Sequence, residues 1–169
     1  MRLQGKAAIV TGGGSGFGEG IVRKFVAEGA KVIVADRDAA AARRVAEATG
    51  SVPLTVDVAR ADDAKRMVDA AYEHFGALDV LVNNAGIGHL PQPLEGLPED
   101  EFDRLFAVNM KAIYLAAREA VPRMKAAGRG VILNMASTAG VSPRPRLAWY
   151  NASKGWVITA TRAMAVELA

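Results

Sequence analysis

Short apolar segments alternate with longer helical segments along the whole of this 169-residue chain. The apolar segments are rich in β-branched residues and bounded by Gly, Asp or Asn, as fully buried strands are. They span residues 7–10, 31–35, 52–56, 78–82 and 130–135. Helical periodicity spans residues 17–28, 38–49, 61–75 and about 99–127. Strands joined by crossover helices predict an α/β fold, a Rossmann-type doubly wound parallel sheet of about five strands with helices on both faces.

Residues that end and begin helices support these boundaries. A glycine follows each helical segment, where a left-handed C-terminal cap is favoured: Gly29, Gly50, Gly76 and Gly128. Asp38 is expected to cap the N-terminus of the second helix. Ligands of such a sheet bind beyond the carboxyl ends of its strands, so we expect the functional residues directly after the strands.

Composition excludes several classes of function. The chain has no cysteine for a disulfide framework or a thiolate metal site, and His89 has no second histidine or acid at metal-ligand spacing. Its 21 basic residues alternate with 18 acidic ones, without the basic block typical of nucleic-acid binding. No secretory signal or membrane-spanning segment is recognisable. We expect one cytoplasmic domain, residues 1–169, without metal, nucleic-acid or membrane partners.

A glycine-rich turn follows the first apolar segment. Residues 11–20 read TGGGSGFGEG, in which Gly12, Gly16 and Gly18 give G-x-x-x-G-x-G and no register gives the commoner G-x-G-x-x-G. Glycines permit a tight strand-to-helix turn and close approach of a pyrophosphate to free N–H groups at the helix N-terminus. A flexible linker is the alternative, but a linker is not expected between a buried strand and an apolar helix.

An acid ends the second apolar segment. Asp36 stands 18 residues after Gly18, about where a carboxylate binds the adenosine ribose hydroxyls. A carboxylate there repels a 2′-phosphate, and Ser15 leaves the glycine turn without a basic residue, so NAD is favoured over NADP. Arg37 is the dissenting feature, because it could receive that phosphate. The structural alternative is that Asp36 is a turn residue ahead of the helix.

Polar residues also follow the third and fourth apolar segments. Asp57 could accept a hydrogen bond from the adenine amino group, and Asn83 and Asn84 could tie strands together or shape the floor of a cofactor site. Each of them alone is equally compatible with simple turn chemistry. Their arrival together at successive strand ends favours the cofactor site.

With T-G-x-x-x-G-x-G at 11–18, N-N-A-G at 83–86, Ser137 and Y-x-x-x-K at 150–154, the chain resembles the short-chain dehydrogenase/reductase family from Met1 to Ala169. The resemblance implies that the glycines hold the pyrophosphate, Asp36 the ribose, Asp57 and Val58 the adenine, and residues 84–86 the nicotinamide end. The predicted cofactor-binding residues are Gly12, Ser15, Gly16, Phe17, Gly18, Asp36, Arg37, Asp57, Val58, Asn84, Ala85, Gly86, Tyr150 and Lys154.

The same resemblance implies a catalytic set of Asn109, Ser137, Tyr150 and Lys154, with Thr138 as the alternative serine-type residue. A secondary alcohol gives up hydride only as its proton leaves, and a free phenol, with a pKa of about 10, is a poor base for that proton. The Lys154 ammonium and the positive nicotinamide ring favour the phenolate of Tyr150. Ser137 would donate to the substrate oxygen, and Asn109 would hold a relay water. An ordinary exposed i,i+4 contact is the structural alternative for the Tyr–Lys pair.

The resemblance also sets expectations for the whole protein. It implies an NAD-dependent oxidoreductase for secondary alcohols and ketones, similar to the 3-oxoacyl-reductase and polyol dehydrogenase group, that forms homodimers or homotetramers through the helices at about 99–127 and 150–168. Family members continue past the point of Ala169 with further strands, a P-G turn and a helical lid, so the last strands are expected to be missing. The alternatives are a 3-oxoacyl thioester substrate, or a catalytically silent fragment that binds a dinucleotide or associates through its helices.

Overall fold

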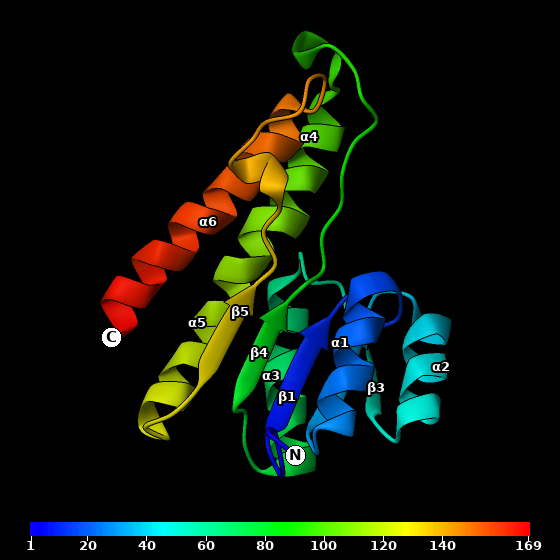
Figure 1. Cartoon of the computed structure of the whole chain (residues 1–169), viewed down its shortest axis with the longest axis vertical. Helices are drawn as coiled ribbons and strands as arrows, with labels where there is room; N and C mark the ends of the chain where they lie inside the picture. Colours follow the sequence, from blue (N-terminus) through cyan, green and yellow to red (C-terminus); the bar gives the residue numbers. More distant parts are fainter.

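Five parallel strands form one sheet in the order β3-β2-β1-β4-β5 (Figure 1). The structure is a computed structural model that describes all residues, 1–169. The strands are β1 Ala7–Thr11, β2 Lys31–Asp36, β3 Val52–Thr55, β4 Val80–Asn83 and β5 Val131–Asn134. The helices are α1 Gly16–Ala27, α2 Ala39–Thr49, α3 Ala61–Phe75, α4 Glu99–Phe106, α5 Ala112–Ala126 and α6 Ala148–Leu168. None of these helices is both long and apolar enough to cross a membrane.

Helices cover both faces of the sheet, and each face has its own core. Alternate residues of β1 point to opposite sides, so Ile9 packs with α3 and α5 while Ala8 and Val10 pack with α1 and α2. Ile9, Ala8 and Val10 are all 0% exposed, which explains why the strand reads as a continuous apolar run. The predicted α/β fold with five parallel strands and helices on both faces is confirmed.

Most predicted boundaries agree with the structure within one or two residues. Gly50 and Gly76 are left-handed C-caps, and the Asp38 side chain caps α2 by accepting from the N–H groups of Ala40 and Ala41. The predicted helix at 99–127 differs in one respect, because a π-helical segment at Ala107–Lys111 separates α4 from α5. A π turn adds one residue to a single helical turn. This changes the spacing of apolar residues too little to be recognised in the sequence.

A buried carboxylate joins three strand starts at the end of the sheet opposite the glycine turn. Asp79 is 8% exposed, and its oxygens accept from the Ala7 N–H at 2.9 Å and the Arg129 Nε at 2.8 Å. Lys6 Nζ lies 3.7 Å from the same carboxylate. Burial alone would raise the pKa of Asp79, but these donors and cations outweigh burial and lower the pKa.

Replacing Asp79 with Asn should lower the free energy of unfolding by about 2 kcal/mol at pH 7. The NH₂ group of the asparagine side chain would replace a carboxylate oxygen and face the buried N–H donors and cations that now surround it. Since the folded-state pKa is lowered, the stabilisation is present above the unfolded pKa of about 3.9 and is lost as pH falls below it. Urea unfolding of wild type and Asp79→Asn from pH 7 to pH 3 measures the difference in their free energies of unfolding, which should become smaller as the pH falls toward 3. The matched control is Asp103→Asn, an exposed position in α4, where no such change is expected.

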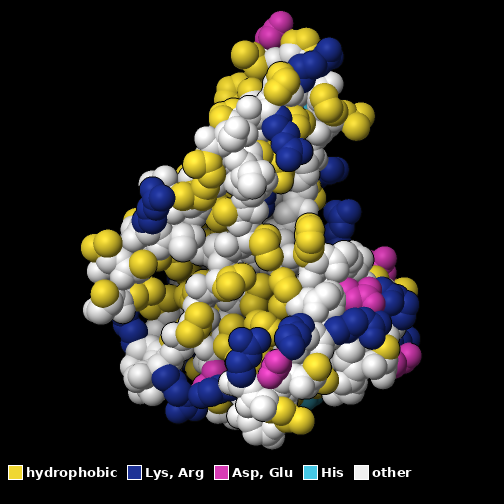
Figure 2. All heavy atoms as spheres, viewed as in Figure 1, with side chains coloured by type: hydrophobic (Ala, Val, Ile, Leu, Met, Phe, Trp, Pro, Cys, Tyr) yellow, Lys and Arg dark blue, Asp and Glu magenta, His cyan; other side chains and the backbone are white.

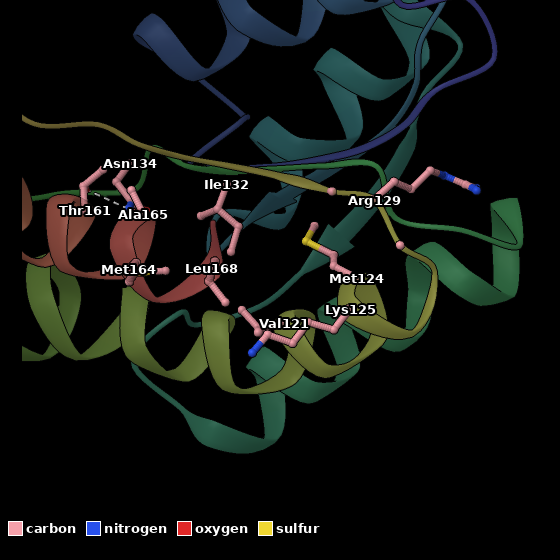
Figure 3. A pocket seen from close by; sticks show the side chains of 12 residues that line it. Val121, Met124, Lys125, Arg129, Ile132, Asn134, Thr161, Met164, Ala165 and Leu168 are labelled. Carbon is pink, nitrogen blue, oxygen red and sulfur yellow. Dashed lines mark hydrogen bonds between the residues drawn. The ribbon is translucent and has the colours of Figure 1, made fainter.

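Strand β5 lies at a free edge of the sheet. Val131 and Leu133 on one face of β5 are 58% and 45% exposed. Figure 2 shows hydrophobic side chains gathered over β4 and β5 on this face. On the other face, Ile132 borders a cavity of about 450 Å³ between α5 and α6 (Figure 3).

Candidate functional site

A cavity of about 480 Å³ lies at the carboxyl ends of the central strands. It is lined by all twelve predicted cofactor residues outside the Tyr–Lys pair: Gly12, Ser15, Gly16, Phe17, Gly18, Asp36, Arg37, Asp57, Val58, Asn84, Ala85 and Gly86. The structure therefore brings together residues that are up to 74 positions apart in the chain.

Seven further residues line this cavity without having been predicted, and three of them, Ala35, Val56 and Ala59, lie in or just after β2 and β3. Ile87 follows the N-N-A-G segment, and Arg104, Ala107 and Val108 come from α4 and the π-helical segment. Positions 104, 107 and 108 have the i, i+3, i+4 spacing of one helix face, which is the signal that could have identified them.

The glycine turn is shaped for close backbone approach. Gly12 and Gly16 have positive φ of 62° and 52°, which favours glycine. A Cβ on Gly18 would lie 1.9 Å from the Gly12 carbonyl oxygen, so α1 starts in direct contact with the turn. Ser15, the N-cap of α1, makes no side-chain hydrogen bond to the first helical turn. The start of α1 therefore offers N–H groups and a positive dipole end that fit the pyrophosphate of a dinucleotide.

Thr11 and Asn84 join the glycine turn to the end of β4. The Thr11 hydroxyl donates to Val82 O at 3.2 Å and accepts from the N–H groups of Asn84 and Ala85, each at 3.0 Å. Asn84 Nδ2 donates back to Thr11 O at 2.9 Å. The role of Thr11 was not predicted, because nothing local marks the first residue of T-G-x-x-x-G-x-G as a hydrogen-bonding centre. Asn83 ties strands together, since its Nδ2 donates to Asn134 Oδ1 of β5 at 2.8 Å.

Asp36 lines the cavity and also organises it. Its Oδ2 accepts from the Gly14 N–H at 2.9 Å, and its Oδ1 accepts from the Asp38 N–H at 3.0 Å. Each carboxylate oxygen has a second lone pair, so Asp36 can hold the turn and still accept from ribose hydroxyls. The turn role and the ribose role proposed as alternatives are compatible. Asp57 is similar, because it lines the cavity while its Oδ1 accepts from the Ala59 N–H at 2.9 Å.

A charge network supports the glycine turn from outside. Glu19 in the first turn of α1 accepts from Arg44 of α2 at 2.6 Å and from Arg23 at 2.8 Å, and these hydrogen bonds lower the pKa of Glu19 to about 2. Arg44 Nη2 also donates to Gly14 O at 2.9 Å. The two arginines compensate the one acid at the helix N-terminus, where an uncompensated acid would repel a phosphate.

The Tyr–Lys pair lies on α6, next to the cavity. Lys154 is 6% exposed, its Nζ donates to Met135 O at 2.8 Å, and it lies 6.0 Å from the centroid of the Tyr150 ring. Burial lowers the pKa of the Lys154 ammonium. A Cβ on Gly86 would lie 3.4 Å from Lys154 Nζ, so the lysine lies next to a residue that lines the cavity. The pair is therefore not an ordinary exposed i,i+4 contact.

Ser137 is the N-cap of the short helical turn η3, Thr138–Gly140, which follows β5. Its Oγ accepts from the Ala139 N–H at 3.1 Å, which orients the hydroxyl and leaves its hydrogen for another acceptor. Thr138 is exposed, whereas Ser137 is half-buried. A Cβ on Gly140 would lie 2.7 Å from Lys154 C, so the turn that carries Ser137 packs directly on the backbone of α6.

Asn109 is 2% exposed and lies in the π-helical segment. Its Oδ1 accepts from the Ile87 N–H at 2.8 Å, and its Nδ2 donates to Ile87 O at 2.9 Å and to Ser153 Oγ at 3.1 Å. Both amide hydrogens are used within the protein. A relay water at this residue would therefore bind to one of its oxygen atoms.

The cavity at the β5 edge has a different character. Figure 3 shows Val121, Met124, Ile132 and Leu168 around it, with Asn134 bonded to Thr161 at one end. None of the predicted site residues lines it. The protein also has no group of three or more His, Asp or Glu side chains that could hold a metal ion.

Comparisons with known proteins agree on one family. A family model described as short chain dehydrogenase matches residues 6–169. The chain is 44% identical to a 4-formylbenzenesulfonate dehydrogenase of Comamonas testosteroni, covering 100% of this chain and 69% of that protein. It is 41% identical to a galactitol 2-dehydrogenase of Agrobacterium fabrum, covering 99% and 66%.

Among solved structures, a 3-ketoacyl-(acyl-carrier-protein) reductase from Brucella melitensis complexed with NADH superimposes with a TM-score of 0.96 at 49% identity. That match covers 98% of this chain and 71% of the reductase. This chain spans about two thirds of the length of the curated relatives it matches.

Proposed function

Because this chain belongs to the short-chain dehydrogenase family, we propose that it is an NAD(H)-dependent oxidoreductase that interconverts a secondary alcohol and a ketone. One observation carries the proposal. Lys154 Nζ and Asn109 Oδ1 lie 3.4 Å and 3.5 Å from the Cβ position of Gly86, at the wall of the glycine-turn cavity. Two residues of the proposed catalytic set therefore lie beside the cavity that we propose holds the dinucleotide.

Tyr150, Lys154 and Ser137 each have a defined task in this reaction. A nicotinamide held in the cavity would supply the hydride acceptor for oxidation of the alcohol and the hydride donor for reduction of the ketone. Tyr150 takes the hydroxyl proton in oxidation and gives it back in reduction. Lys154 favours the phenolate by its charge, and Ser137 donates its free hydrogen to the substrate oxygen as charge develops there. Met135 O and the packing of Gly140 hold Lys154 and Ser137 in place.

The relatives support the chemical class and suggest two substrate types. The galactitol dehydrogenase is named for a polyol, and the Brucella protein for a 3-ketoacyl group on acyl-carrier protein. We propose a secondary alcohol or ketone as the substrate, with a 3-oxoacyl thioester as the second candidate because the reductase has 49% identity over 98% of this chain. A dinucleotide-binding or helix-mediated association fragment without turnover is the competing function.

Two measurements on the chain test the proposed function. Fluorescence titration with NADH should give saturable binding, and NADH oxidation should be detected with a panel of ketones and a 3-oxoacyl thioester. Binding with turnover supports the oxidoreductase. Binding without turnover on any member of the panel would favour the fragment function. The absence of NADH binding would contradict both the oxidoreductase and a dinucleotide-binding fragment, and would leave helix-mediated association.

Asp36→Asn should shift cofactor preference from NADH toward NADPH by about tenfold, because it removes a negative charge from the place of the 2′-phosphate. Arg37 beside it would then attract that phosphate without opposition. Dissociation constants for NADH and NADPH measure the ratio. Asp62→Asn, an exposed acid of α3 outside the cavity, is the control and should leave the ratio unchanged. An unchanged ratio in Asp36→Asn would contradict the assignment of this residue to the ribose.

The helices also carry a surface suited to self-association. Phe106, Tyr114 and Trp156 are 43%, 56% and 38% exposed on the segments at 99–127 and 150–168. Aromatic residues that are exposed on neighbouring helices are typical of protein interfaces. We propose that the chain forms a homodimer or homotetramer through these helices, which analytical ultracentrifugation can measure.

A further inference from the structure

A buried serine lies one helical turn after the proposed base. Ser153 is 2% exposed, and its hydroxyl donates to Tyr150 O at 2.8 Å while accepting from Asn109 Nδ2 at 3.1 Å. It makes the only side-chain hydrogen bond between the π-helical segment and α6. Ser153 falls at an x position of Y-x-x-x-K and is not among the predicted site residues.

The hydrogen bonds of Ser153 extend to the wall of the cofactor cavity. Asn109 holds both backbone groups of Ile87, which lines that cavity directly after Gly86. A continuous path of hydrogen bonds therefore runs from Ile87 through Asn109 and Ser153 to the carbonyl of Tyr150. Removing the Ser153 hydroxyl breaks the path at its centre and leaves a buried Asn109 N–H without its acceptor.

Helix stability alone does not explain a serine at this position. A serine that hydrogen-bonds to a preceding carbonyl slightly destabilises and bends a helix, whereas alanine is the best helix former. The gain in helix propensity from Ser153→Ala should offset only part of the stability lost with the hydrogen bond, because a buried donor without an acceptor costs more than the propensity of one residue gains. The substitution should also change how α6 is placed against the cavity.

We infer that Ser153 is a positioning residue of the proposed reaction, which fixes Tyr150 and Lys154 relative to the nicotinamide end of the cavity. The inference rests on the proposed oxidoreductase function and adds a residue to it. Ser153 touches neither cofactor nor substrate in this role. It acts through Asn109 on one side and through the backbone of Tyr150 on the other.

The test compares Ser153→Ala with Thr159→Ala, which removes a hydroxyl from an exposed position of the same helix. Ser153→Ala should lower kcat about 10- to 100-fold, as a displacement of about 1 Å does, with the NADH dissociation constant within twofold of wild type. Thr159→Ala should match wild type in both. Equal kcat in wild type and Ser153→Ala would overturn the inference while leaving the proposed function intact.

Ser153→Cys covers the case in which the alanine variant does not fold. The thiol fills nearly the same space but forms weak hydrogen bonds, so kcat should change in the same direction as in Ser153→Ala and by less. A Cys variant that folds and has the kcat of wild type would also overturn the inference.

Discussion

Tyr150→Phe should lower turnover by about 10²- to 10⁴-fold while the NADH dissociation constant stays within twofold of wild type. The substitution removes one oxygen atom and keeps the ring, whose edge lies 3.8 Å from the Cβ position of Gly88. The cavity residues are not touched, because Tyr150 does not line the glycine-turn cavity. Initial rates with the best substrate of the panel and NADH titration measure the two quantities.

The control is Tyr72→Phe, which makes the same chemical change in α3, at a residue that does not line the cavity. The turnover rate of this variant should equal that of wild type. Undiminished turnover in Tyr150→Phe would contradict the assignment of Tyr150 as the acid–base residue. Loss of NADH binding together with turnover would show instead that the phenol supports the cofactor cavity.

The sequence predicted the strand ends well because the relevant physics is local. A buried parallel strand must be apolar along its length, so the first polar residue after it marks the end at which ligands bind. Asp36, at the end of the buried strand β2, was identified in this way and lines the cavity. Asp57 also lines it, although it follows the half-exposed edge strand β3. Glycines that follow helical segments, such as Gly50 and Gly76, mark helix ends for an equally local reason.

The residues that were missed depend on contacts between distant parts of the chain. Arg44 supports the glycine turn from 30 positions away, and Ser153 meets Asn109 across 44 positions. In the sequence, Arg44 resembles an ordinary exposed helical arginine and Ser153 an ordinary helical serine. Their roles appear only when α2 is placed beside α1 and α6 beside the π-helical segment.

The π-helical segment is the structural feature that the prediction of Asn109 as a site residue lacked. Asn109 was assigned through family resemblance, and helical periodicity placed it in a regular helix. In the structure the π turn lies at Ala107–Lys111, and the Asn109 side chain is buried and bonded to Ile87. π-Helical turns are frequent at functional sites, where they re-aim a side chain without ending the helix.

Gly18→Ala should have the second large effect, a loss of NADH affinity of at least about 100-fold together with destabilisation of about 2–4 kcal/mol. The added Cβ would lie 1.9 Å from Gly12 O and 2.7 Å from Asn84 Nδ2, so the start of α1 must move away from the glycine turn. Backbone atoms cannot yield as a flexible side chain can. The movement would displace both the helix N-terminus and the Asn84 contact that positions the turn.

Gly20 provides a matched control two residues further along α1, because a Cβ there meets nothing within 4 Å. Gly20→Ala should raise the free energy of unfolding by about 0.5–1 kcal/mol through helix propensity and leave NADH affinity unchanged. Urea unfolding and NADH titration of both variants separate a loss of affinity from a general effect of alanine in this helix. If Gly18→Ala bound NADH as tightly as Gly20→Ala, the glycine turn would not be the pyrophosphate site, since the contact between Gly18 and Gly12 is what brings the helix N-terminus to the cavity.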